Sequence, residues 1–163
     1  MIVKGTFPVR PKQAADQSWV DAVLREHWGE GPILVHGAAF DACSLPALIA
    51  GDREGLATYA VDSEQSEAEL VTLNALTPRR GVGTALVSAL GDLLAGQGIA
   101  RLRVTTTNDN LNALGFYEKL GFRVVAKRPG AVAESRKLKA SIPLFGANGL
   151  PLRDEIDLVF DVV

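Results

Sequence analysis

Cysteine and histidine are scarce in this chain. Its 163 residues include one cysteine, Cys43, and two histidines, His27 and His36. A single cysteine excludes a framework of internal disulfide bonds, and so few sulfur and imidazole ligands argue against a zinc site. No histidine stands beside Cys43 in a catalytic motif, so we do not expect Cys43 to act as a nucleophile. We therefore expect no bound metal.

Long apolar runs and an excess of positive charge are also missing. No stretch approaches the ~20 apolar residues of a membrane span, and residues 1–10 lack the apolar core of a signal peptide. Lysine and arginine number 17 against 19 aspartate and glutamate residues, so the net charge is −2. Such a balance provides no bulk attraction to nucleic acid or to an anionic membrane. We expect a cytoplasmic protein with neither of these as a partner.

The chain does contain enough apolar material for a core. Apolar residues make up 47% of it and charged residues 22%, which excludes a disordered tail. Its length is that of one domain, and a domain of this size buries roughly 70% of its unfolded surface without needing disulfides or metals. We predict a single domain over residues 1–163.

Hydrophobic periodicity divides the sequence into helices and strands. Apolar residues recur every three or four positions over 16–28 and from Val82 to Gly96, which predicts two amphipathic helices. Between them, three runs rich in strand formers predict an antiparallel meander. The meander strands are 45–50, 55–62 and 67–76, and the remaining predicted elements are strands 1–10, 100–107, 122–128 and 154–163 and a helix at 108–121.

Two segments have no clear period. Residues 33–44 are ambiguous, and residues 129–153 are predicted to form a long loop with one helical turn at 132–139. Asp16 is the expected N-cap of the first helix, and Asn108 or Asn110 that of the third. A meander followed by a β-α-β unit predicts a mixed sheet with helices on both faces, an α+β fold of α/β/α layers.

The turn between the meander and the second helix contains two glycines and two arginines. Gly81 and Gly83 stand where the helix begins, so unpaired backbone N–H groups and the positive end of the helix dipole lie beside them. Arg79 and Arg80 add two positive charges. The combination predicts an anion site of the kind that binds phosphate, although two glycines can also do no more than shape a tight turn. Neither a Walker A loop nor a dinucleotide-binding fingerprint is present.

Two spaced motifs give this turn a family resemblance. Residues 78–83 match the glycine half of the pattern Gln/Arg-x-x-Gly-x-Gly/Ala, with Pro78 at its first position. Residues 110–122 match every defined position of Asn-x-x-Ala-x-x-x-Tyr-x-x-x-Gly-Phe. The chain therefore resembles the GNAT superfamily of acyl-CoA-dependent N-acyltransferases. The resemblance implies a mostly antiparallel sheet of about seven strands, splayed between the fourth and fifth strands, with helices on both faces.

The resemblance also implies a substrate and its contacts. Acetyl-CoA is the implied acyl donor, and its acetyl group passes by direct attack to a primary amine. Its pyrophosphate is expected at the glycine turn and its pantetheine arm between strands 67–76 and 100–107, where a backbone N–H polarises the thioester oxygen. Asn74 interrupts the first of these strands, which suits either a bulge or a strand end. The implied binding residues are Leu73, Asn74, Ala75, Arg79, Arg80, Gly81, Val82, Gly83, Thr84, Asn110 and Tyr117.

Two proton transfers accompany such a reaction. Tyr117 is the implied general acid for the departing thiolate, because the reference pKa of a phenol, ~10, is close to the ~8.5 of a thiol. Glu69 is our first choice of general base. Glu67 competes with it because strand alternation puts both on one face, and His36 or a chain of water molecules are further candidates. The alternative is that both glutamates are simply solvated at the start of the strand.

The acceptor is expected between residues 29–45 and 129–153. Basic residues around the second segment fit either an acceptor with a carboxylate or phosphate or a solvated face; they are Arg128, Arg136, Lys137 and Lys139. A small-molecule amine is the favoured acceptor. A catalytically silent acyl-CoA-binding module and a protein N-acetyltransferase are the alternatives. The last strand, 154–163, is predicted to be a sheet edge through which a homodimer could form.

Overall fold

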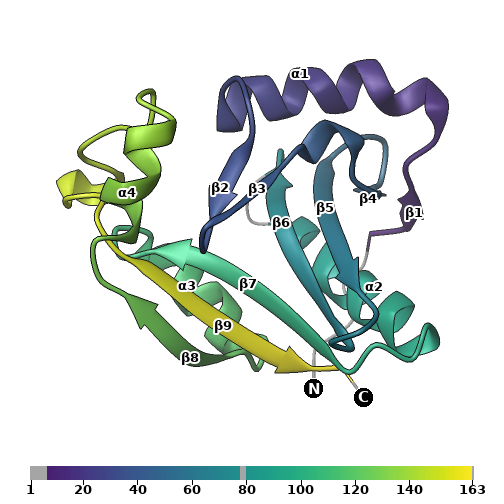
Figure 1. Cartoon of the computed structure of the whole chain (residues 1–163). Helices are drawn as coiled ribbons and strands as arrows, with labels where there is room; N and C mark the ends of the chain where they lie inside the picture. Colours follow the sequence, from purple (N-terminus) through teal and green to yellow (C-terminus); the bar gives the residue numbers. More distant parts are fainter. Residues whose placement is uncertain (1–6, 78–79, 163) are drawn as a thin grey trace.

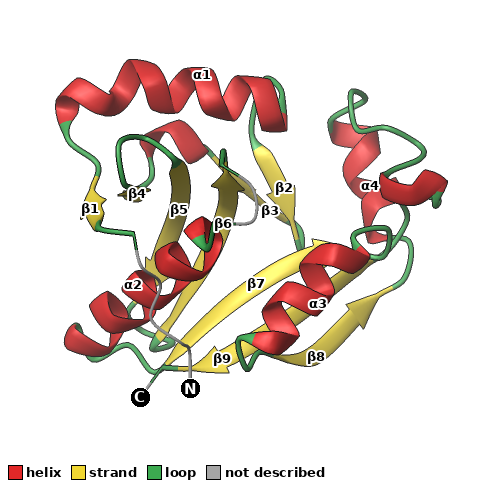
Figure 2. Cartoon of the chain, turned by 180° about the vertical axis from the view of Figure 1, so that it is seen from behind, coloured by secondary structure: helices red, strands yellow, loops and turns green. Residues whose placement is uncertain are grey.

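The computed structural model describes residues 7–77 and 80–162 and shows a β-sheet between two layers of helices (Figures 1 and 2). Four α-helices are present in these residues: α1 (Gln17–Trp28), α2 (Val82–Gly96), α3 (Leu111–Lys119) and α4 (Ala131–Leu138). The strands are β1 (Val9–Pro11), β2 (Ile33–Val35), β3 (Ala38–Phe40), β4 (Ala47–Ala50), β5 (Gly55–Asp62), β6 (Glu67–Ala75), β7 (Arg101–Thr107), β8 (Arg123–Arg128) and β9 (Glu155–Asp161).

Seven of these strands form the central sheet, in the order β1-β4-β5-β6-β7-β9-β8. Every neighbouring pair is antiparallel except β6 and β7, which run parallel. Strands β2 and β3 form a separate hairpin within the ambiguous segment 33–44. The predicted α+β class, the antiparallel meander and the sheet of about seven strands are confirmed.

The sheet opens between its fourth and fifth strands, β6 and β7. They pair only from Glu67–Arg101 to Leu70–Val104, although β6 continues to Ala75 and β7 to Thr107. Beyond this short parallel ladder the two strands diverge, and the gap between them is plain in Figure 2. The predicted splay is therefore confirmed.

Each face of the sheet packs against its own helices. On one face, α1 contributes Val20 and Leu24 to a core that includes Ile49 of β4. On the other face, α2 contributes Leu86 to a larger core that includes Leu48 of β4. Consecutive residues of β4 thus point to opposite faces, as the two-residue period of a strand requires. The second core also holds the start of α2 and one side of α3 against the sheet.

A β-bulge in β6 changes which face its later residues occupy. Thr58 of β5 pairs with Thr72, but the next residue, Tyr59, pairs with Leu70, so Val71 has no partner in the ladder. Val71 packs in the α1 core, and the Thr72 hydroxyl lies 2.6 Å from that of Thr58. Because one residue is inserted, Leu73 returns to the α2 face instead of pointing toward α1.

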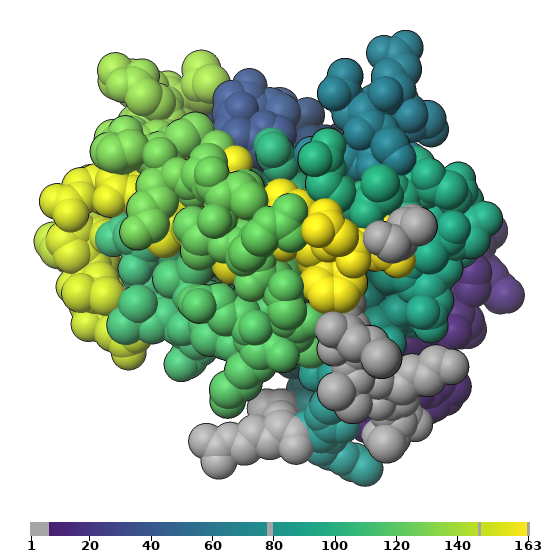
Figure 3. All heavy atoms as spheres, turned by 90° about the horizontal axis from the view of Figure 1, so that it is seen from below, coloured from purple at the N-terminus to yellow at the C-terminus, as the bar shows by residue number. Residues whose placement is uncertain are grey.

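The prediction that the last strand forms an edge of the sheet is wrong. The terminal strand β9 is not a sheet edge, because it lies between β7 and β8. The space-filling view from below shows its yellow surface with green residues on one side and teal residues on the other (Figure 3). The edge beside β9 is β8. A dimer through an exposed β9 is therefore excluded in this fold.

Two predicted helix caps have different outcomes. The Asn110 side chain accepts the backbone N–H of Ala113 at 3.1 Å and caps α3, as expected. Asp16 stands at the N-cap of α1 but makes no cap hydrogen bond to that helix. Its carboxylate instead accepts from Arg10, Arg53 and the backbone of Gln13. No helix in the described part of the chain is long and apolar enough to cross a membrane.

Candidate active site

A cavity of about 580 Å³ lies where β6 and β7 diverge. One wall is formed by β6 and the beginning of α2, and the other by the end of β7 and by α3. The separation of the two sequence motifs by a helix and a strand brings them to opposite sides of this one space. The expected binding residues that border the cavity are Leu73, Ala75, Gly81, Val82, Gly83, Thr84, Asn110 and Tyr117.

The beginning of α2 offers backbone donors to the cavity. Gly81 has φ 77°, a left-handed conformation that glycine adopts without strain, and it makes no side-chain cap. The first backbone hydrogen bond of the helix runs from Ala85 N–H to Gly81 O, so the helix itself uses no N–H of residues 82–84. These N–H groups lie at the positive end of the helix dipole, which favours an anion.

Gly83 has a second reason to lack a side chain. A Cβ atom built on it would lie 3.2 Å from Phe116 Cζ of α3, closer than an ordinary van der Waals contact. Glycine at this position therefore lets α3 approach the first turn of α2. Both glycines of the motif have a structural requirement, and both border the cavity.

Tyr117 reaches the cavity from α3. Its ring makes edge contacts with Phe116 and Phe122, at centroid distances of 5.1 and 5.3 Å, which fix its orientation. Burial raises the pKa of Tyr117 above its ordinary value, so the phenol stays protonated at neutral pH. Its hydroxyl has no hydrogen-bond partner among residues 7–77 and 80–162. Tyr117 is therefore a protonated phenol among the residues that line the cavity.

Asn74 does not form the bulge that its polarity suggested. It pairs with Leu56 in the regular ladder, and the bulge lies three residues earlier, at Val71. The Asn74 side chain instead accepts a hydrogen bond from Trp28 Nε1 at 2.8 Å. Trp28, the last residue of α1, borders the cavity, and nothing in its local sequence distinguishes it from a residue of the core.

The two arginines of the turn are not both placed. Arg79, like Pro78, lies outside the described residues. Arg80 is exposed, and its guanidinium carbon lies 5.7 Å from the centroid of the Phe7 ring. Arg80 does not border the cavity but a separate surface hollow with Phe7 and Glu54.

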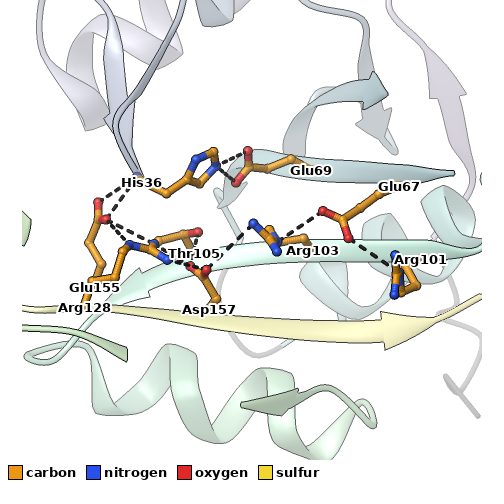
Figure 4. A network of polar contacts seen from close by, with 9 residues as sticks. All are labelled: His36, Glu67, Glu69, Arg101, Arg103, Thr105, Arg128, Glu155 and Asp157. Atoms are coloured by element: carbon orange, nitrogen blue, oxygen red, sulfur yellow. Dashed lines mark hydrogen bonds and ion pairs between the residues drawn. The ribbon is translucent and has the colours of Figure 1, made fainter. Parts of the chain in front are cut away.

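Two candidate bases, Glu69 and His36, are in direct contact. His36 Nε2 lies 2.7 Å from both carboxylate oxygens of Glu69 (Figure 4). His36 stands at the tip of the β2–β3 hairpin, whose turn has positive φ at His36 and Gly37, as in a type I′ turn. Burial raises the pKa of Glu69, and the hydrogen bond with His36 only partly opposes this. The carboxylate is thereby a stronger proton acceptor than an exposed glutamate.

Glu69 stands beside the opening of the sheet and is not among the residues that line the cavity there. Its ladder partner is Arg103, and the next pair, Leu70–Val104, is the last before β6 and β7 diverge. Its side chain lies on the α1 face with that of Glu67, as strand alternation predicts. Glu67 is occupied by Arg103 and Arg101, at 3.2 and 3.6 Å. Of the two glutamates, Glu69 is the one without an arginine partner.

A chain of ion pairs connects the sheet to the hairpin (Figure 4). Arg128 Nη2 donates to Asp157 at 2.6 Å and lies 3.1 Å from Glu155. Glu155 in turn accepts the backbone N–H of His36 at 3.0 Å. Burial alone would raise the pKa of Asp157, but hydrogen bonds from Arg128 and Thr105 outweigh it and lower that pKa. His36 is thus held by its backbone on Glu155 and by its ring on Glu69.

Comparison with known proteins assigns this arrangement to a family. The model of the acetyltransferase (GNAT) family matches residues 53–122, which contain β5, β6, α2, β7 and α3. The uncharacterized protein YxbD of Bacillus subtilis (strain 168) is 33% identical over 144 residues, which cover 86% of this chain and 89% of YxbD. The chain belongs to the GNAT acetyltransferase family.

Solved GNAT structures share the fold over its whole length. The IAA acetyltransferase from Bacillus cereus ATCC 14579 superposes with a TM-score of 0.71 at 16% identity, covering 94% of this chain and 99% of that one. A Bacillus subtilis acetyltransferase in complex with CoA superposes with a TM-score of 0.68 at 17% identity, covering 97% and 100%. The chain therefore has the GNAT fold. Together with the family match, this fold identifies it as an acetyl-CoA-dependent acyltransferase.

A second cavity of about 450 Å³ adjoins the first in this GNAT protein. It is lined by the end of α1, by β2, by α4 and by parts of residues 142–152. These are the segments 29–45 and 129–153 in which an acceptor was expected. Trp28, Thr105, Thr106 and Asn110 border both cavities, so the two spaces share a wall.

The basic residues near this second cavity are already engaged by the protein. Arg128 binds Asp157 and Glu155, and Arg136 donates to the backbone carbonyls of residues 142, 143 and 152. Lys137 pairs with Glu134, and Lys139 Nζ donates to the carbonyls of Trp28 and Pro32. The inference that these charges await a carboxylate or phosphate on the acceptor therefore loses its basis. Among the described residues, no group of three or more His, Cys, Asp or Glu could hold a metal ion.

Proposed function

We propose that residues 1–163 form one domain that transfers the acetyl group of acetyl-CoA directly to the primary amine of a small molecule. One observation carries this proposal. The open N–H groups of α2, the unpaired edge of β6 and the Tyr117 phenol all meet at the cavity where the sheet opens. Acetyl-CoA offers a chemical complement to each of them: a pyrophosphate, an amide-bearing arm and a thioester.

The chain binds the donor with backbone groups rather than with a specific side chain. The N–H groups of residues 82–84 are aimed at the pyrophosphate, where the helix dipole stabilises negative charge. The amides of the pantetheine arm replace the strand partner that β6 lacks beyond Leu70. An N–H of Leu73–Ala75 then donates to the thioester oxygen, on which negative charge develops during attack. Asn110 keeps its oxygen for capping α3, and its amide group borders the arm.

Two side chains carry out the proton transfers of the reaction. Glu69 accepts a proton from the acceptor ammonium through a water molecule, because Glu69 does not itself line the cavity, and His36 passes that proton on. The free amine forms a C–N bond to the acetyl carbon as the C–S bond breaks. Tyr117 donates its proton to the departing sulfur, and the second proton that the nitrogen loses on becoming an amide restores the phenol through solvent. No covalent link between acetyl group and protein is needed.

The second cavity supports a small molecule as acceptor. Residues of α4 and of the segment 142–152 line it on one side. Its volume lies in the range of small-molecule sites. A protein acceptor requires a groove that is open along its length, and a silent acyl-CoA sensor has no use for a Glu69–His36 pair.

Acetyl-CoA binding can be tested by two glycine substitutions in the same helix. We expect Gly83→Ala to raise the Kd for acetyl-CoA, measured by isothermal titration calorimetry, by at least about ten-fold, because the new methyl group displaces Phe116 into the cavity. Gly96→Ala is the matched control, since a Cβ there meets nothing within 4 Å. Equal affinities of both variants for acetyl-CoA would contradict its binding at the start of α2.

Turnover is tested by the release of CoA with small amines and with short peptides as acceptors. We expect amine-dependent release with small amines and little with peptides. Binding of acetyl-CoA without release for any acceptor would indicate the silent module, and preference for peptides would indicate a protein N-acetyltransferase. Chromatographic detection of CoA avoids thiol reagents that could react with Cys43.

A further inference from the structure

The β2–β3 hairpin is anchored differently at its two ends. At the open end, Ile33 packs in the α1 core. The other end, the tip, consists of His36 and Gly37. Among residues 7–77 and 80–162, the tip makes hydrogen bonds only to Glu69 and Glu155, and His36 makes both. Because two paired strands of three residues have little stability of their own, these two contacts determine where the tip lies.

The backbone of the tip is in a conformation that needs support. His36 has φ 40°, in the left-handed region where a residue with a side chain is strained. Its N–H donates to the Glu155 carboxylate, at 3.0 Å from Oε1 and 3.3 Å from Oε2. Glu155 therefore holds the turn through its backbone, whereas Glu69 contacts the imidazole.

Glu155 is itself fixed to the central sheet. It is the first residue of β9, and its side chain is only 4% exposed. Arg128, its ladder partner on β8, lies 3.1 Å from the carboxylate. Arg128 also donates to Asp157, which accepts the Thr105 hydroxyl at 2.7 Å. The acceptor of the His36 N–H thus belongs to a network that joins three strands of the sheet (Figure 4).

We propose that Glu155 is a positioning residue for the base, a role that rests on the proposed acetyl transfer. Glu155 and Glu69 lie on opposite sides of His36, as Figure 4 shows. By accepting the His36 N–H, Glu155 keeps the imidazole Nε2 at 2.7 Å from both oxygens of Glu69. This is the contact through which the proton leaves Glu69. Without the acceptor on Glu155, the tip moves and the imidazole leaves Glu69.

A direct role in acceptor binding is the rival explanation, because Glu155 also lines the second cavity. The two roles differ in their dependence on His36. A residue that acts through His36 has no further effect once the imidazole is removed, whereas a residue that binds the amine keeps its effect. A double-mutant cycle between Glu155 and His36 therefore distinguishes them.

Two substitutions of similar length isolate the hydrogen bond. Glu155→Gln keeps an oxygen that can accept the His36 N–H, and Glu155→Met has none. We expect Glu155→Met to lower kcat/KM for CoA release at neutral pH by about five-fold, and Glu155→Gln by less than about two-fold. Release is measured with whichever of ethanolamine, lysine and glucosamine the wild type acetylates fastest. Equal losses in the two variants would overturn the proposal.

The cycle is completed by combining Glu155→Met with His36→Ala. We expect the double variant to be no slower than His36→Ala alone. A further loss as large as that caused by Glu155→Met in the wild type would overturn the positioning role and assign Glu155 to the acceptor.

The pH profile provides a readout that a loss of stability alone does not move. The hydrogen bond with His36 lowers the pKa of Glu69, against the larger effect of burial, which raises it. Arg103 of β7 also lowers this pKa, and Asp157 of β9 raises it. Loss of the imidazole raises the pKa of Glu69, so the acid limb should move to higher pH in Glu155→Met as in His36→Ala. An unmoved limb in Glu155→Met would overturn the proposal.

Asp154 provides the matched control. Its carboxylate also accepts a backbone N–H, that of Gly130 at the start of α4, at 2.9 Å. We expect Asp154→Ala to keep the acid limb of the wild type, and any loss of rate to add to that of His36→Ala. An equal shift of the limb in Asp154→Ala and Glu155→Met would assign the effect to the fold and overturn the proposal.

Hydrogen exchange on the wild-type protein tests the contact even if Glu155→Met does not fold. We expect the His36 amide to be protected at least about ten-fold more than the Gly37 amide, which has no acceptor among the described residues. Equal protection of the two amides would overturn the proposal. Acetyl-CoA binding without CoA release for any amine would instead contradict the proposed transfer, and the positioning role with it, whatever the exchange result.

Discussion

Replacing Tyr117 by phenylalanine should reduce kcat for CoA release by at least about ten-fold while leaving the Kd for acetyl-CoA unchanged. The substitution removes one hydroxyl and keeps the ring contacts with Phe116 and Phe122. Since that hydroxyl has no partner among the described residues, its loss leaves no buried group unsatisfied. The substitution should therefore slow the departure of the thiolate without lowering the stability of the fold. Steady-state kinetics and calorimetry on one preparation separate the two effects.

The second tyrosine of the chain provides the control. Tyr59 is also buried in the α2 core, and burial raises its pKa as it does that of Tyr117. Unlike Tyr117, Tyr59 does not line the cavity between β6 and β7. Tyr59→Phe should therefore leave kcat near that of the wild type. A full rate in Tyr117→Phe would discard the acid role, and equal losses in both variants would attribute the effect to the core.

Replacing Glu69 by glutamine should lower kcat/KM at neutral pH by about one hundred-fold and abolish the acid limb of the pH–rate profile. Burial raises the pKa of Glu69, so in the wild type the carboxylate is lost as pH falls through a value above that of an exposed glutamate. Activity should accordingly rise with pH through this raised pKa. In Glu69→Gln this carboxylate is absent. The remaining slow rate should therefore not change with pH over the range of the acid limb.

Glu67→Gln is the matched control for Glu69. It changes the same residue type on the same strand face, but at a carboxylate bound to Arg101 and Arg103. We expect it to keep the acid limb and most of the rate. Persistence of the limb in Glu69→Gln would assign it to another group. A loss of rate in Glu67→Gln equal to that in Glu69→Gln would leave Glu69 without a special role.

The parts of this site that the sequence predicts are those built from local pattern. Gly81 and Gly83 at a helix start, and Asn110 and Tyr117 on the next helix, stand at fixed spacings within two short motifs. Their backbone conformation and helix register follow from those spacings. The splay of the sheet was implied by the family resemblance and is present as expected.

What the sequence does not reveal depends on long-range pairing. The place of β9 between β7 and β8, the bulge at Val71 and the hydrogen bond from Trp28 to Asn74 each require knowledge of strand register. The contact of His36 with Glu69 joins residues from different sheets, whereas the sequence offers each of them only as a separate candidate base. A signal for the ion-pair network was available, because charges alternate with apolar residues in both 101–104 and 155–158.

Local charge counts were also misleading. The basic residues around 128–139 suggested an anionic acceptor, but Arg128 is neutralised by Asp157, which is distant in sequence, and Arg136 by backbone carbonyls. A run of cations is informative only when the carboxylates and carbonyls opposite it are known.

A crystal structure of the protein with acetyl-CoA tests the central claim most directly. We expect the pyrophosphate on the backbone N–H groups of residues 82–84, the pantetheine arm along β6 beyond Leu70, and the thioester sulfur within hydrogen-bonding distance of the Tyr117 hydroxyl. Acetyl-CoA bound away from the opening between β6 and β7, or a sulfur atom out of reach of Tyr117, would contradict it.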